Sequence, residues 1–198
     1  MDQALETARY DLFTLEAGAR LVWKNSNRGV SLEPAGLQLK RGGRWQSLAY
    51  ADFRTVTLST ARVGASRVIG QCTLTLRTGQ RLVITNTNAA GLSDGLRDTL
   101  YREFVRDLHR QLVESGAAER ISFRSGFSTA RVTVLLIALS AAALLFIALP
   151  AILLLVTRDL RALWVLIGGG TLLAPAASLA RSNRPASYDP ARPPDLLP

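Results

Sequence analysis

Three hydrophobic patterns follow one another along the chain. Between residues 20 and 85, short segments alternate apolar and polar positions and are separated by turns rich in Gly, Pro and Asn. From Leu92 to Leu112 the apolar residues recur every four positions, the period of an amphipathic helix. From Val132 to Ala180 two long apolar segments flank a short polar turn. The order predicts strands, then one amphipathic helix, then two apolar helices.

The alternating region predicts seven short strands. They are expected at Leu21–Trp23, Val30–Glu33, Leu37–Lys40, Trp45–Leu48, Phe53–Ser59, Cys72–Arg77 and Leu82–Thr85. Cys72 falls on the face that alternation buries, which favours an inert core thiol over a reactive one. Residues 1–19 show neither alternation nor a strong cap, so a short helix or an irregular arm is expected there.

The amphipathic segment predicts one helix that lies against the strands. Its apolar stripe consists of Leu92, Leu96, Leu100, Phe104, Leu108 and Leu112. Ser93 is expected to cap its start, and Gly116 is a suitable stop at its end. His109 lies between Leu108 and Arg110 without a partner nearby in sequence. A solvated helix position is therefore the favoured interpretation of this histidine over a catalytic one.

The apolar run is interpreted as a transmembrane hairpin. Between Arg131 and Arg158 there are 26 residues without a charge, and 16 of the 25 from Val132 to Val156 are Leu, Ile, Val or Phe. Membrane insertion of this segment is favoured by about −5 to −8 kcal/mol. Residues 162–180 form a second charge-free segment, whose apolar content is lower because it includes Gly and Pro residues. The alternative is a pair of helices in the core of a soluble domain.

Small residues lie at similar depths in the two apolar segments. They are Ala141, Ala142 and Ala143 in the first segment and Gly168, Gly169 and Gly170 in the second. Because small residues let helix backbones approach closely in lipid, these triplets are expected to pack together.

The net charge of +9 is concentrated beside the apolar segments. Residues 1–119 hold 16 basic and 12 acidic residues, whereas residues 120–198 hold 8 and 3. Six basic residues flank the hairpin and two lie in its turn, so the positive-inside rule places both termini in the cytoplasm. The flanking residues expected to meet anionic lipid are Arg120, Arg124, Arg131, Arg181 and Arg184. Mixed charges without interleaved aromatics disfavour nucleic acid as a partner.

A search for catalytic and ligand-binding motifs finds none. The sequence contains no GxGxxG, P-loop, HExxH, CxxC or GxSxG pattern, and it has one cysteine and one histidine. No catalytic residue, metal ligand or cofactor is therefore predicted, and the protein is expected not to be an enzyme. The apolar segments carry no ionisable group, which disfavours ion transport. Of the 24 basic residues 22 are Arg, a bias typical of a GC-rich bacterial genome.

The stretches Val30–Lys40 and Leu48–Leu58, followed by one helix, resemble the bacterial membrane-associated pleckstrin-homology-like proteins. The resemblance covers residues 20–114 and implies an antiparallel barrel that a C-terminal helix closes. Members of that superfamily bind lipid head groups through basic residues in the first hairpin. The matching candidates here are Lys24 and Arg28, with Lys40, Arg41 and Arg44 in the following turn. Protein contacts or general anionic-lipid contacts are the implied role.

The predicted fold class is α+β: a cytoplasmic PH-like antiparallel β-barrel closed by a C-terminal amphipathic helix, then a two-helix transmembrane hairpin. The expected segments are an arm (1–19), the PH-like domain (20–116), a juxtamembrane linker (117–131), two spans (132–156 and 162–180) joined by a periplasmic turn (157–161), and a cytoplasmic tail (181–198). These features predict a non-catalytic, multi-pass protein of the bacterial inner membrane, with the bilayer and an unknown protein as partners. The alternative is a homo-oligomeric small channel or membrane-assembly subunit.

The tail carries five prolines in its last sixteen residues and cannot continue a helix. A disordered terminus is one interpretation. The other is that the tail, with Tyr188, Leu196 and Leu197 as apolar anchors, folds back along the barrel or onto a partner and inserts Leu196 and Leu197 into an apolar groove.

Overall fold

Alternating apolar positions build one large sheet in the computed structural model, which describes residues 8–17, 27–41, 43–63, 67–88, 90–92, 94–158 and 161–194. The strands are β1 (Ala8–Ala17), β2 (Asn27–Glu33), β3 (Gly36–Arg41), β4 (Arg44–Ala49), β5 (Phe53–Val63), β6 (Arg67–Leu76), β7 (Arg81–Thr85), β8 (Ser122–Ser125) and β9 (Ala186–Ser187). Their order across the sheet is β4-β3-β2-β1-β7-β6-β5-β8-β9. Neighbouring strands are antiparallel except β5 and β8, which are parallel.

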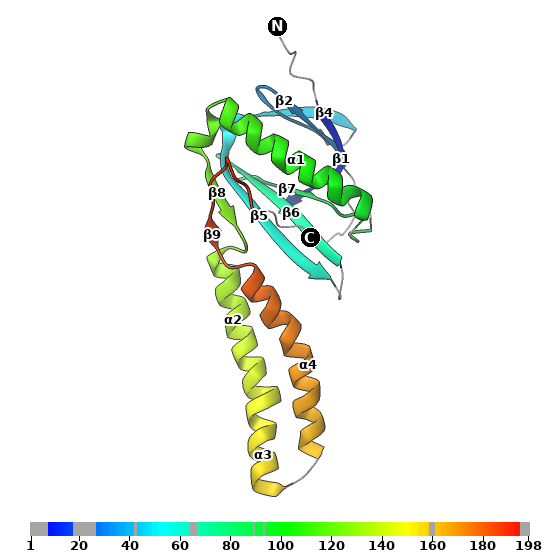
Figure 1. The fold of residues 1–198 in the computed structure, drawn as a ribbon, viewed down its shortest axis with the longest axis vertical. Coiled ribbons are helices and arrows are strands. Elements are labelled where there is room, and N and C mark those ends of the chain that lie inside the picture. The colour runs from blue at the N-terminus through cyan, green and yellow to red at the C-terminus, as the bar shows by residue number, and fades with distance from the viewer. Residues whose placement is uncertain are drawn as a thin grey trace. The chain divides into compact units, whose positions relative to one another are not determined.

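The sheet is mixed and is not closed into a barrel (Figure 1). Among the described strands, β4 at one end and β9 at the other each pair on one side only. The predicted PH-like antiparallel barrel is therefore wrong. The physical reason lies after the amphipathic helix, where the chain returns as β8 beside β5 and later as β9, so that the sheet is extended on that side.

The N-terminal region contributes a strand in the middle of the sheet. β1 pairs with β2 on one side and with β7 on the other, and its register shifts between Tyr10 and Phe13. The expectation of an irregular arm or short helix is therefore wrong for Ala8–Ala17. The strand expected at Leu21–Trp23 lies outside the described residues.

Apolar side chains from the sheet form the core together with one helix. Cys72, Leu74 and Leu76 are all buried, which confirms the alternation predicted for this strand. Phe53, Val56 and Leu58 of β5, Leu82 and Ile84 of β7, and Leu37 and Leu39 of β3 complete much of the same cluster.

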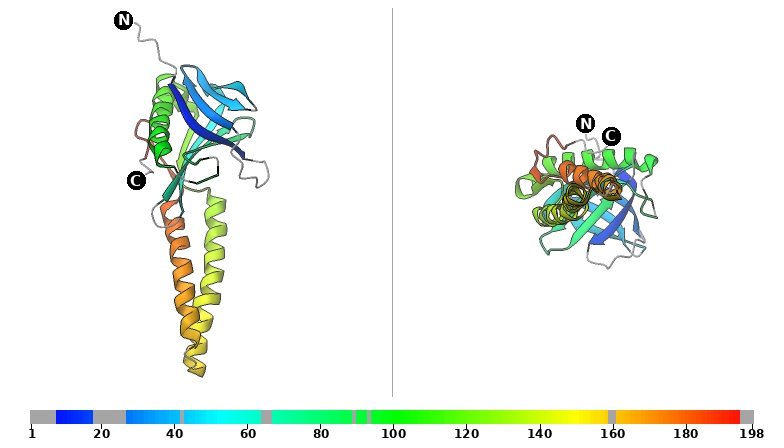
Figure 2. Two further views of the ribbon diagram at one scale, coloured as in Figure 1. Left: turned by 90° about the vertical axis from the view of Figure 1, so that its right-hand side faces the viewer. Right: turned by 90° about the horizontal axis from the view of Figure 1, so that it is seen from below.

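Helix α1 (Gly95–Glu114) lies across one face of the sheet (Figures 1 and 2). Phe104, Leu108 and Leu112 are buried as predicted, but Leu96 is 84% exposed and Leu92 lies before the helix. Asp94 caps the helix by accepting a hydrogen bond from the Leu96 N–H; Ser93, the predicted cap, lies outside the described residues.

Gly116 follows the end of α1 with a φ of 70°, a left-handed conformation that glycine adopts readily. The predicted helix stop at this residue is confirmed. The segment expected as a juxtamembrane linker begins with the 3-10 turn η2 (Ala117–Arg120) and β8, so residues 117–126 belong to the same compact unit as the sheet.

Three polar contacts hold α1 at a defined place on the sheet. The Tyr10 hydroxyl donates to the Asp107 carboxylate, the Asn86 amide donates to Asp98, and the Tyr50 hydroxyl contacts Gln111. Tyr50 belongs to the 3-10 turn η1 (Tyr50–Asp52), which precedes β5. Because each bond has one directional partner, the set determines the position of α1 more strictly than apolar packing does.

Residues 127–185 form a second compact unit, separate from the sheet and α1. Within it, α2 (Thr129–Ala143), a π-helical turn η3 (Leu144–Ala148) and α3 (Leu149–Thr157) form one continuous rod. Helix α4 (Arg161–Ser182) runs beside this rod in both figures.

The predicted two-helix transmembrane hairpin is wrong as it was stated. Of the described helices, only Val132–Thr157 is long and apolar enough to cross a membrane. Helix α4 is not among the described helices that meet that criterion. A multi-pass protein therefore has no support from the helices that are described.

Replacing Phe104 by Ala should lower the free energy of unfolding of the sheet unit by about 3–5 kcal/mol, because the fully buried ring leaves a cavity. Leu96→Ala is the control on the same helix, and its effect should stay within about 0.5 kcal/mol. Denaturant titration of the full chain in detergent, followed by circular dichroism, measures both. Equal losses for the two variants would contradict the packing described.

Candidate functional site

The most unusual surface belongs to the helix Val132–Thr157, which has 26 residues. None of its most apolar stretch is buried inside the structure. Its exposed large apolar residues are Val134, Leu136, Ile137, Leu144, Leu145, Phe146, Ile147, Leu149, Ile152, Leu153, Leu155 and Val156. Hydration of one such side chain costs about 1.5–3 kcal/mol relative to burial, so this surface is strongly unfavourable in water.

Pro150 accounts for the π-helical turn in this rod. A proline inside a helix has no N–H for the carbonyl four residues earlier and its ring clashes with that carbonyl, which here belongs to Phe146. The backbone takes the wider π-helical form over Leu144–Ala148, just before the proline. The Leu149 N–H donates to the carbonyl five residues earlier, that of Leu144. The rod therefore continues past the proline without ending.

Gly169 of α4 lies against the same place. A Cβ atom built on Gly169 would be 2.7 Å from the Phe146 Cβ and 2.8 Å from the Phe146 carbonyl oxygen. A Cβ on Gly168 or Gly170 would meet nothing within 4 Å. Of the small residues expected to pack together, Gly169 is thus the glycine in close contact, and its neighbour is Phe146 rather than the triplet Ala141–Ala143.

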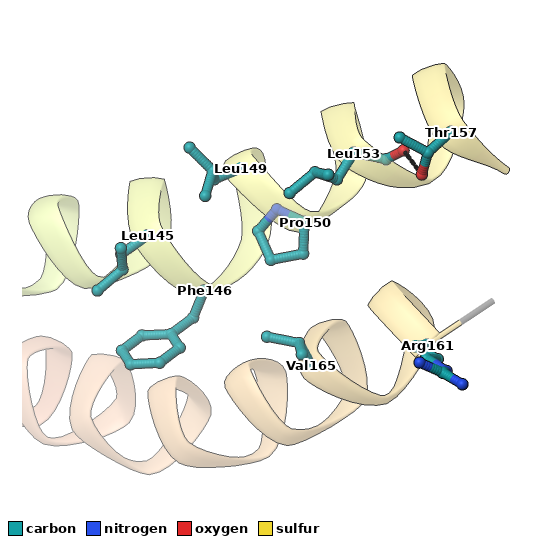
Figure 3. A pocket seen from close by; sticks show the side chains of 8 residues that line it. All are labelled: Leu145, Phe146, Leu149, Pro150, Leu153, Thr157, Arg161 and Val165. Atoms are coloured by element: carbon teal, nitrogen blue, oxygen red, sulfur yellow. Dashed lines mark hydrogen bonds between the residues drawn. The ribbon is translucent and has the colours of Figure 1, made fainter. Parts of the chain in front are cut away.

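A shallow groove of about 510 Å³ lies next to this contact (Figure 3). It is lined by Leu145, Phe146, Leu149, Pro150, Leu153, Thr157, Arg161 and Val165. Within this lining the Thr157 hydroxyl donates a hydrogen bond to the Leu153 carbonyl at 2.7 Å. The lining is suited to hydrocarbon and offers no arrangement for catalysis.

The basic residues predicted to meet lipid are distributed over both units. Lys24 lies outside the described residues, and Arg28 forms an ion pair with Asp11. Lys40 and Arg41 end β3 and Arg44 begins β4, so the three residues lie on either side of the turn between these strands. Arg120 and Arg124 are exposed on η2 and β8. Arg131 and Arg181 belong to α2 and α4, and Arg184 follows α4.

Trp45 joins the basic residues at the β3–β4 turn, and the sequence analysis gave it no role. Its side chain is 48% exposed. The Arg9 guanidinium lies 5.9 Å from its ring centroid, within cation–π range. The aromatic and basic residues around this turn could have indicated a binding surface from the sequence. The contact between Trp45 and Arg9 could not be predicted, because β1, which carries Arg9, was not predicted as a strand.

His109 is buried, so the prediction of a solvated histidine is wrong. Its Nδ1 lies 2.6 Å from the Val105 carbonyl oxygen and therefore donates, which leaves Nε2 to accept from the Tyr188 hydroxyl at 2.8 Å. The rings of His109, Phe123 and Tyr188 lie 5.5–5.7 Å apart, centroid to centroid. Burial lowers the pKa of His109, and the bond to Val105 opposes part of that shift.

Tyr188 anchors the C-terminal tail to the sheet unit. β9 pairs with β8 just before it, and the Tyr188 N–H donates to the Phe123 carbonyl at 3.4 Å. The prediction of a tail that folds back is confirmed at Tyr188, whereas Leu196 and Leu197 lie outside the described residues. The sequence could not show this contact, because His109 and Tyr188 are 79 positions apart.

The polar residues of the sheet unit do not assemble a catalytic site that can be named. Among the described residues no group of three His, Cys, Asp or Glu side chains could hold a metal ion. Burial raises the pKa of the Cys72 thiol to about 12, so the thiol stays protonated and unreactive at neutral pH.

Gly169→Ala should weaken the packing of α4 on the rod, because the new methyl group would overlap Phe146. Gly168→Ala and Gly170→Ala are matched controls that meet open space and should stabilise the helix by about 0.5–1 kcal/mol. Thermal unfolding of the full chain in detergent, followed by far-ultraviolet circular dichroism, compares the three. The contact is absent if Gly169→Ala behaves like its neighbours.

The buried neutral His109 should make the sheet unit less stable in acid. Because the folded pKa lies below the unfolded value of 6.5, the unfolded chain binds the proton first. The contribution of neutral His109 to the free energy of unfolding is therefore fully present above pH 6.5. It is lost as the pH falls from 6.5 toward the folded pKa. Unfolding measured between pH 8 and pH 5 should show a shallower acid loss in His109→Gln than in the native chain.

Tyr188→Phe is the control for that measurement. It keeps the ring and removes the hydroxyl, so it should lower the free energy of unfolding by about 0.5–1.5 kcal/mol at neutral pH. Parallel pH profiles for the native chain and His109→Gln would show that another group causes the acid loss.

No protein-family model matches the chain, and no curated protein sequence matches it. The resemblance to pleckstrin-homology-like proteins is therefore left without a test.

Proposed function

We propose that this chain is a non-catalytic, membrane-anchored protein whose sheet unit is an interaction module. The observation that carries the proposal is the helix Val132–Thr157, whose most apolar stretch is entirely unburied. A core helix of a soluble protein with this composition would be covered by other elements. Entry of the helix into a bilayer replaces unfavourable hydration of its apolar side chains with contact to lipid.

The flanking charges support an orientation with the sheet unit on the cytoplasmic side of a bacterial inner membrane. Arg120, Arg124 and Arg131 precede the apolar helix within 12 residues of Val132. Basic residues this close to an apolar helix are retained on the cytoplasmic side and attract anionic lipid. Arg120 and Arg124 are exposed, as such a role requires.

The sheet unit supports a role in binding rather than chemistry. Several of its buried polar side chains are joined in structural hydrogen bonds, as Tyr10 is to Asp107 and His109 to Tyr188. The alternative of an oligomeric channel required two spanning helices, and the described helices provide one that qualifies. An anchored module that recruits a partner is the function that these features favour.

Anchoring is tested by extracting membranes that contain the full chain with alkaline carbonate. The native chain should remain in the pellet, whereas Ile137→Arg combined with Ile152→Arg should release or destabilise it. Each arginine costs about 2.5–3.5 kcal/mol near the bilayer centre. Ile137 and Ile152 are both exposed in the structure, so neither change disturbs internal packing.

Val113→Arg is the matched control, because Val113 is an exposed apolar residue of α1. This variant should stay in the pellet like the native chain. Complete extraction of the native chain by carbonate would contradict a membrane-inserted helix.

A further inference from the structure

The outer edge of β4 is open to a further strand. Among the described strands β4 pairs only with β3, and it lies at the end of the sheet. Tyr50 directly follows β4 and Ala35 directly precedes β3, and the Tyr50 N–H donates to the Ala35 carbonyl at 3.2 Å. The main chain of Tyr50 therefore points toward β3, as does that of every second residue before it in β4. By the alternation of an antiparallel ladder, the N–H and C=O groups of Trp45, Ser47 and Ala49 point the other way, toward the open edge.

Positive charge is gathered at the tip of this edge. Arg41 lies directly opposite Arg44 in the β3–β4 pairing, and Lys40 lies opposite Trp45. Like charges directly opposite each other on neighbouring strands destabilise the pair. The ion pairs found among the described residues use Asp11, Asp94 and Asp107, and none involves Arg9, Lys40 or Arg44. The tip is therefore suited to an anionic partner.

Trp45 gives the tip a fixed apolar surface. A Cβ atom built on Gly29 would lie 3.4 Å from Cη2 of Trp45, so the indole ring lies against the β2 backbone. The φ of Gly29 is +111°, a conformation that other residues rarely adopt. Arg9 lies beside the ring, and about half of the side chain remains exposed for contact with a partner.

We propose that the open edge of β4 binds an extended, acidic peptide segment of a partner protein as an added strand. The outward main-chain groups supply hydrogen bonds. On one face of the sheet Trp45 and Lys40 lie opposite each other and supply apolar contact and positive charge, and on the other face Arg44 binds carboxylates. The regular spacing of N–H and C=O groups suits a peptide main chain better than a nucleic acid, whose binding also favours several stacked aromatics. The inference rests on the proposed function, since it names the partner chemistry of the interaction module.

Binding is tested with the full chain in nanodiscs of neutral lipid and a labelled peptide in which Glu alternates with Val. Fluorescence anisotropy should show saturable binding of this peptide and none of a matched peptide with Lys in place of Glu. An acidic peptide of the same charge with proline at alternate positions cannot form the main-chain bonds, and it should bind about tenfold more weakly.

Variants locate the site on the protein. Lys40→Glu combined with Arg44→Glu should weaken binding of the Glu peptide at least about tenfold, because attraction becomes repulsion. Arg54→Glu combined with Arg106→Glu changes the charge equally at exposed positions on β5 and α1, and it should change affinity less than about twofold. Ser47→Pro removes an outward N–H from the edge and should also weaken binding, with circular dichroism to verify that the sheet is intact.

The proposal is overturned if the Lys peptide binds equally well, or if the tip and control variants lose the same affinity. It is also overturned if the tip variant loses binding only to a single-stranded oligonucleotide or to vesicles of anionic lipid, while the Glu peptide never binds. The carbonate test separates this failure from failure of the anchor. The tip variant leaves Val132–Thr157 unchanged, so it should stay in the membrane pellet whether or not the peptide binds.

Discussion

Burial of one side of α1 against the sheet is the interaction on which the sheet unit depends. A sheet that is not closed leaves an apolar face in need of cover, and Phe104, Leu108 and Leu112 supply it. The hydrogen bonds from Tyr10 to Asp107 and from Asn86 to Asp98 then select one position for the helix on that face. Without α1 the core of the sheet unit would be exposed.

The same helix holds the end of the chain. His109 accepts a hydrogen bond from Tyr188, and the two rings meet Phe123 of β8. Because β8 precedes the apolar helix and β9 follows α4, the chain leaves the sheet and returns to it on paired strands. The short strands β8 and β9 have little stability of their own, so the ring cluster is what makes their pairing durable.

The helical unit follows a different physical rule. Its apolar residues point outward, and its internal contact is the close approach of Gly169 to Phe146 at the π-helical turn that Pro150 causes. In water such a surface is unfavourable, whereas in lipid the outward residues are solvated and small residues mediate the helix contact. The contrast between the exposed apolar helix Val132–Thr157 and the buried core of the sheet unit is the physical basis of the proposed membrane-anchored module.

Local periodicity in the sequence determined the buried face of Cys72, Leu74 and Leu76, the stripe from Phe104 to Leu112, the stop at Gly116 and the extent of the apolar helix. These features depend on residues within a few positions of one another. Only the tertiary structure decided that Ala8–Ala17 is a central strand, since its register shift breaks the alternation. It also decided that β8 and β9 extend the sheet, that His109 is buried by Tyr188, and that Arg9 joins Trp45. Each of these depends on partners distant in sequence, whose pairing leaves no periodic signal in either segment.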